Sequence, residues 1–123
     1  MIIAAAVAAG IEPTVACLAR AFAHDAITGC LLQAGDGYAQ RLTRFFTLLM
    51  RARVALGMPV LVGRVGAEPS AGAMGHDSTR PAWPDAIAQD RGRSEQATPG
   101  LTQRMAVYDA TPWCQFRPRT PGR

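Results

Sequence analysis

The chain of 123 residues is long enough for one small domain and too short for two of typical size. Hydrophobic residues make up 49% of it and charged residues 18%, which excludes a fibrous or wholly disordered chain. The formal net charge is +4 and all 13 basic residues are Arg, but they are scattered and accompany no nucleic-acid reader motif, so we expect no nucleic-acid partner.

Residues 1–7 are predicted to form a short strand. A helix is then expected to begin near Glu12 and Pro13, because proline suits a first helical turn in which its missing N–H would be unpaired anyway. This helix should end near His24 or Asp25. Its buried stripe is predicted to consist of Val15, Leu18, Ala19 and Phe22, with Cys17 also on the inner face.

Residues 26–37 are predicted to be a loop with one helical turn at residues 30–33. A long helix should follow over residues 38–56, with Gly57 as its C-cap and Pro59 preventing its continuation. Its apolar stripe is predicted to contain Leu42, Phe45, Phe46, Leu49, Arg53 and Leu56. The side chains expected to face water are Arg41, Arg44 and Arg51.

Residues 60–65 are predicted to form a second strand, followed by a turn over residues 66–69. Residues 71–76 should return beside it as a hairpin partner. Pro69 is expected at the start or the edge of that strand, because proline cannot donate to the ladder.

The remaining sequence is more polar, and two weaker helices are predicted over residues 86–96 and 101–108, before an irregular tail. We interpret residues 1–85 as the main part of the domain and residues 86–123 as a polar helical segment with that tail. Together they make a single, incomplete domain.

The cysteines Cys17, Cys30 and Cys114 have no CxxC spacing and no histidine at ligand distance along the sequence. An odd, scattered set argues against a disulfide framework and against a zinc site, so we expect no metal and a reduced, cytoplasmic setting. No stretch approaches the roughly 20 apolar residues that span a bilayer, so we expect no membrane partner.

Several phrases, in this order, resemble the amino-terminal half of GNAT-type N-acetyltransferases. They are VACLARAFAHDAITGCLL, GYAQRLTRFFTLLMRARVALGMPVLV, AGAMGHDSTRPAWP, LTQRMAVYDA and FRPRTP. The resemblance implies an α/β (α+β) fold, here a partial one: a short, mostly antiparallel sheet of about three strands. Two main helices would pack on the sheet, with one or two weaker helices towards the C-terminus.

The resemblance also implies acetyl transfer from acetyl-CoA to an amine. In that family a glycine-rich loop follows a strand and opens a helix, whose N–H groups bind the pyrophosphate. Residues 35–37 and 71–75 are rich in glycine, but neither is expected in that context. We therefore interpret the chain as a truncated acetyltransferase with no catalytic or cofactor-binding residue, to which acetyl-CoA is not expected to bind unaided.

By resemblance, an apolar wall for the amine substrate would consist of Leu31, Leu32, Tyr38 and Trp83. The alternative is that these side chains simply cover the core. His76 beside Asp77 suggests a general base, but no nucleophile or acyl donor site accompanies the pair, so a solvated turn is the favoured interpretation.

Four functions stay open from the sequence. The chain is an inactive acetyltransferase fragment, or an acetyltransferase completed by another chain. A third option is a non-catalytic binding or dimerisation module built on the same helices and hairpin, and nucleic-acid binding through Arg is a remote fourth. An incomplete sheet also has bare edges, so self-association through an exposed edge is expected.

Overall fold

The computed structural model describes residues 1–75 and 81–110. Its elements in chain order are β1 (Ile2–Ala5), the 3-10 turn η1 (Ala8–Gly10), α1 (Ile11–Ala21), α2 (Ala26–Leu32), α3 (Tyr38–Ala55), β2 (Val60–Val65), β3 (Glu68–Met74), α4 (Asp85–Ala97) and α5 (Leu101–Ala110). The predictions for His76 and Asp77, and for the tail from residue 111 onward, lie outside the described residues.

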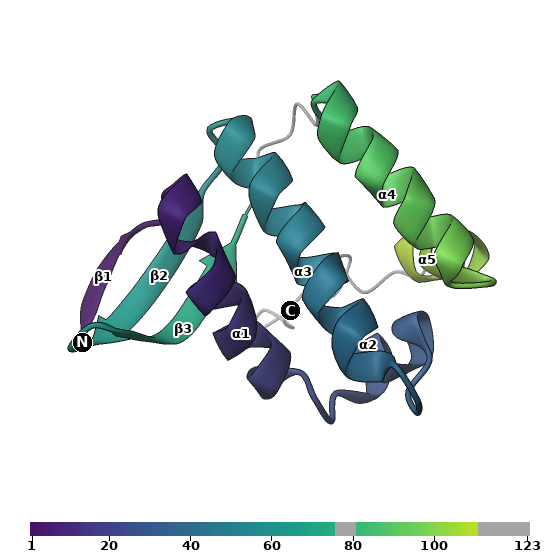
Figure 1. Ribbon diagram of the computed structural model, residues 1–123, viewed down its shortest axis with the longest axis horizontal. Coiled ribbons are helices and arrows are strands. Elements are labelled where there is room, and N and C mark those ends of the chain that lie inside the picture. Colours follow the sequence, from purple (N-terminus) through teal and green to yellow (C-terminus); the bar gives the residue numbers. More distant parts are fainter. Residues whose placement is uncertain (76–80, 111–123) are drawn as a thin grey trace, which may run out of the picture.

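The three strands form one antiparallel sheet in the order β1-β2-β3. Helix α1 lies across one face of this sheet and packs against α3, and α4 packs on α3 in turn (Figure 1). Helices α2 and α5 contact each other at the far end of the molecule. The predicted α+β class is therefore confirmed, with about three strands, two main helices and further helices towards the C-terminus.

Helix α1 follows the predicted pattern. Val15, Leu18 and Cys17 are buried, and Ala19 and Phe22 pack partly buried against the same core. The main core joins this stripe to buried side chains from the neighbouring elements, namely Leu32, Leu42, Phe46, Met50, Val60 and Leu101.

The segment predicted as a loop with one helical turn is instead a seven-residue helix, α2. Its N-cap is Asp25, whose carboxylate accepts hydrogen bonds from the backbone N–H of Thr28 at 2.8 Å and from its hydroxyl at 2.7 Å. An N-cap acceptor supplies a partner for an N–H group that the first helical turn leaves unpaired. The prediction missed α2 because it gave weight to the nearby glycines and none to this cap.

Helix α3 is the central element. It ends at Ala55, one residue before the predicted end, and Leu56 is its C-cap, so Gly57 lies just beyond the cap. The N–H of Met58 donates to the Arg53 carbonyl at 2.9 Å, and the N–H of Gly57 donates to the Val54 carbonyl at 3.2 Å. This pair of bonds is a Schellman motif, which requires the left-handed φ of +68° at Gly57.

Helix α3 is buried on more than the predicted stripe. Leu48 and Ala52, which the stripe did not include, pack against Ile87 of α4 and the partly buried Trp83. Arg51, predicted to face water, forms an ion pair with Asp90 of α4. The sequence of α3 alone does not predict this second buried face, because the residues that cover it come from a later part of the chain.

The hairpin begins earlier than predicted, since β3 includes Glu68, Pro69 and Ser70. Gly66 adopts a φ of +63° in the turn, and the register shifts by one residue next to Gly63. This bulge accommodates the proline, which lies on an edge strand where a missing donor is tolerated.

Candidate functional site

Of the four side chains predicted to line an acceptor wall, three lie in or against the main core, namely Leu31, Leu32 and Tyr38, and Trp83 lies apart from them. Leu32 is 2% exposed and belongs to the main core. The Tyr38 hydroxyl donates to the Phe22 carbonyl at 3.1 Å, so it ties the start of α3 to the end of α1. Leu31 lines a pocket between α2 and α5.

Trp83 lies towards the other end of α3. Its ring packs on the cluster of Leu48, Ala52 and Ile87, and the Arg91 guanidinium carbon lies 4.3 Å from the ring centre. Positions 38 and 52 of a helix are roughly 21 Å apart at 1.5 Å per residue. Trp83 therefore covers the α3–α4 contact and shares no wall with the residues near the start of α3.

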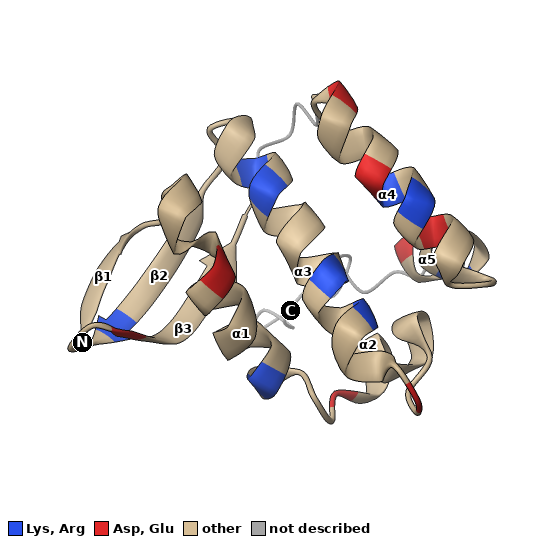
Figure 2. Ribbon diagram, in the orientation of Figure 1, with Lys and Arg blue, Asp and Glu red and all other residues tan. Residues whose placement is uncertain are grey.

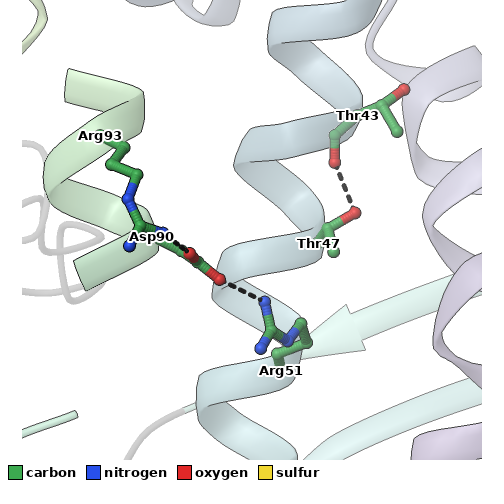
Figure 3. A network of polar contacts seen from close by, with 5 residues as sticks. All are labelled: Thr43, Thr47, Arg51, Asp90 and Arg93. Atoms are coloured by element: carbon green, nitrogen blue, oxygen red, sulfur yellow. Dashed lines mark hydrogen bonds and ion pairs between the residues drawn. The ribbon is translucent and has the colours of Figure 1, made fainter. Parts of the chain in front are cut away.

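A groove of about 870 Å³ lies between α1 and α3, and Ile87 of α4 also lines it. Small side chains line much of it, and its polar residues are Glu12, Thr43, Thr47 and Arg51. In Figure 3 the Thr47 hydroxyl points at the Thr43 carbonyl of its own helix, to which it donates at 2.7 Å.

The charged groups beside this groove are largely satisfied within the chain. The Asp90 carboxylate lies between two guanidinium groups, 3.1 Å from Arg51 and 2.6 Å from Arg93 (Figure 3). Residues 1–75 and 81–110 contain no group of three or more His, Cys, Asp or Glu side chains that could hold a metal ion. The groove is thus a gap between packed helices whose threonine and arginine groups already serve the fold.

The glycine-rich segment at residues 35–37 opens α3, with Gly37 as its N-cap, but it follows α2 and not a strand. The Arg41 guanidinium binds the carbonyl oxygens of Leu32, Gln33 and Asp36 there. Phosphate binding requires N–H groups that point at the anion. This loop instead presents oxygens to a cation.

Within residues 1–75 and 81–110, three groups have shifted pKa values. The Thr28 hydrogen bonds lower the pKa of the Asp25 carboxyl. Burial raises the pKa of the Tyr38 hydroxyl, with a smaller contribution from the charge of Asp25, and burial lowers the pKa of the Arg53 guanidinium. Asp25 and Arg53 also have structural roles, since Asp25 caps α2 and Arg53 donates to the Gly75 carbonyl at 3.1 Å.

The most distinctive surface is the sheet face opposite α1, which we call the open face. Strand alternation assigns the inner face to Val60, Val62 and Gly72, where a Cβ on Gly72 would meet Leu18 of α1 at 3.3 Å. The open face consists of Ile3, Ala5, Leu61, Gly63, Val65, Ala71 and Ala73, with Glu68 opposite Val65 at one end.

The open face is apolar and exposed. Ile3 is 67% exposed, Val65 62% and Leu61 45%, although Leu61 lies in the central strand. In Figure 2 charged residues are concentrated on the helices, and the strands are uncoloured apart from short segments at one end of the hairpin. The charged strand residues are Arg64, on the inner face, and Glu68, which pairs with Val65 at one end of the open face.

The open face was not predicted from the sequence. The pattern of β2 could have indicated it, because Leu61 and Val65 are apolar although Val60 and Val62 already supply the inner face. A strand covered on one side only is expected to alternate apolar and polar residues. Apolar residues on both faces indicate a strand with contacts on both sides.

No single helix of the described segments has the length and hydropathy to cross a membrane, although residues 8–21 and 26–32 together reach that length with a 110° bend between them. Comparisons with protein-family models, curated proteins and solved structures find no match to this chain.

Proposed function

We propose that this chain is a non-catalytic dimerisation module whose open face binds the open face of a second copy. The observation that carries the proposal is an exposed, mainly apolar sheet face, with Glu68 at one end of it, on a chain with a net charge of +4. Contiguous exposed apolar patches on soluble proteins mark interaction surfaces, because leaving them in water is unfavourable.

The shape of the open face suits a second copy. Its large side chains, Ile3, Leu61 and Val65, come from β1 and β2, whereas β3 contributes only Ala71 and Ala73. A two-fold axis between two such faces places the large side chains of one copy over the small ones of the other. The face carries no basic side chain, and its one charged strand residue, Glu68, lies at its end, so two copies of a basic chain meet at the centre of the face without bringing like charges together.

Pairing through a strand edge is less suited to this chain than packing through the face. At one edge, β3 contains Pro69 and a bulge at Ser70, two features that discourage the addition of another strand. At the other edge, β1 has only four residues. The proposal therefore replaces the expected edge contact with a face contact.

Sedimentation velocity over a range of concentrations tests the proposal. The wild-type chain should sediment as a reversible dimer, and Leu61→Glu should be monomeric because it places a charge at the centre of the open face. Ala39→Glu is the matched control, since Ala39 is exposed in the first turn of α3. A monomeric wild type, or a Leu61→Glu dimer, would contradict a face-to-face assembly.

A second candidate is an acetyltransferase-like part of a larger fold, acting on an amine with acetyl-CoA. The element order and the antiparallel order β1-β2-β3, with α1 and α3 packed together, favour it by their agreement with the GNAT-type resemblance. Calorimetric titration of acetyl-CoA separates the two candidates. Binding heat from this chain alone would overturn the non-catalytic proposal, and its absence at millimolar cofactor would support it.

A further inference from the structure

The pocket between α2 and α5 has the features of a small-molecule site. Its volume is about 490 Å³, within the range of roughly 300–1,000 Å³ that such sites occupy. Ile27 and Leu31 of α2 face Val107 of α5 across it, and none of its lining residues is Asp or Glu. It lies on the helical side of the molecule, so its occupancy does not depend on the proposed dimer.

Arg104, which lines this pocket, has one side-chain nitrogen without a partner. Arg104 donates from Nε to the Leu31 carbonyl at 2.9 Å and from Nη1 to the Pro99 carbonyl at 3.0 Å. Its third nitrogen, Nη2, is buried and has no hydrogen-bond partner within the described part of the chain. Leaving a buried charged donor unpaired is unfavourable, and two fixed bonds hold the guanidinium in place while the third stays open.

We propose that the α2–α5 pocket binds a small carboxylic acid with an apolar body. The carboxylate accepts a hydrogen bond from Arg104 Nη2, and the body lies against Ile27, Leu31 and Val107. A guanidinium and a carboxylate form a charge-assisted bond that is stronger than a neutral one. The guanidinium repels cationic ligands, and the single unpaired nitrogen matches one carboxylate better than a phosphate with three oxygens.

Access to Nη2 requires a side chain at the pocket rim to rotate, because the atom has no exposed area before a ligand enters. Gln103 lines the pocket and is exposed. Rotation of an exposed side chain of this kind occurs within nanoseconds and therefore sets no barrier to binding.

Cys30 provides the readout, because its thiol is exposed and lines the same pocket, whereas Cys17 is buried. In a Cys114→Ser background, the rate of Cys30 alkylation by iodoacetamide is measured by mass spectrometry. Octanoate is the probe and octan-1-ol, which has the same chain length without the charge, is its control. We expect octanoate to slow alkylation saturably and to bind roughly tenfold more tightly than the alcohol, as one charge-assisted bond implies.

Two variants on α5 locate the effect without removing Arg104. Val107 is 64% exposed, so Val107→Glu should leave the fold intact while its carboxylate repels the probe. Ala106→Glu carries the same charge at an exposed neighbouring position that does not line the pocket. Octanoate protection that is lost in Val107→Glu and kept in Ala106→Glu supports the proposal. The proposal is overturned if octanoate and octan-1-ol protect Cys30 from alkylation equally, or if neither probe protects it.

Discussion

Arginine side chains in this protein bind its own backbone. Arg41 donates to carbonyl oxygens of the loop before α3, Arg53 donates to the Gly75 carbonyl and Arg104 to those of Leu31 and Pro99. A planar guanidinium offers five donors in a fixed fork and can bridge several carbonyls, which a lysine ammonium does less well. The exclusive use of Arg is therefore compatible with structural roles and does not require a nucleic-acid partner.

Asp25 offers a test at a single residue. Its lowered pKa means that the ionised carboxylate stabilises the folded state at pH values above its ordinary pKa of 3.8, and that this contribution is lost as the pH falls through the lowered value. Asp25→Ala should lower the thermal midpoint at pH 7, because Thr28 loses both of its bonds to the cap.

Asp25→Asn separates the cap from its charge. Asparagine still accepts the hydrogen bond but does not titrate, so this variant should keep most of the stability at pH 7. Its loss of stability between pH 5 and pH 2, followed by circular dichroism, should be smaller than that of the wild type. An identical pH dependence in both proteins would show that the Asp25 cap contributes nothing to it.

At the scale of elements, the sequence predicted those features that depend on residues close together in the chain. The C-terminus of α3 was predictable because Gly57 and Pro59 act within a few residues. The second buried face of α3 was not, because Leu48 and Ala52 pack against Ile87, which lies 39 and 35 positions later in the sequence. The place of Trp83, apart from the other three residues of the predicted acceptor wall, was not predictable for the same reason, since it depends on where the chain from residue 81 onward packs on α3.

Glycine substitutions test two of these elements with one chemical change. Gly57→Ala should destabilise the protein by about 1 kcal/mol, since alanine at a positive φ is strained. A Cβ there would contact nothing within 4 Å, so the cost comes from the backbone alone. Chemical denaturation measures it.

Gly92→Ala is the matched comparison. Gly92 lies inside α4, and a Cβ there also meets nothing within 4 Å. Alanine should stabilise the helix by about 0.5–1 kcal/mol, because it restricts the unfolded chain and favours the helix. The two substitutions should therefore shift the denaturation midpoint in opposite directions. Shifts of the same sign would be inconsistent with the assigned ends of α3 or α4.

For the whole molecule, the arrangement is asymmetric. The main core lies between α1, α3 and the inner face of the sheet, and α4 and α5 extend it away from the strands. The described helices thus provide a core on one side of a three-stranded sheet only. Small sheets need packing against an apolar face for stability. The proposed dimer should therefore stabilise the folded chain as well as determine its assembly.

That link predicts a concentration-dependent melting temperature. A partner that binds only the folded chain raises its stability by mass action, and a tenfold increase in concentration should raise the midpoint by roughly 2–4 °C. The effect should disappear in Leu61→Glu, whose open face is charged, and persist in Ala39→Glu. Differential scanning calorimetry from micromolar to near-millimolar protein provides the measurement. If the thermal midpoint of the wild type stays constant over this range, the open face is exposed to water in the folded protein. That result would contradict the proposed dimer.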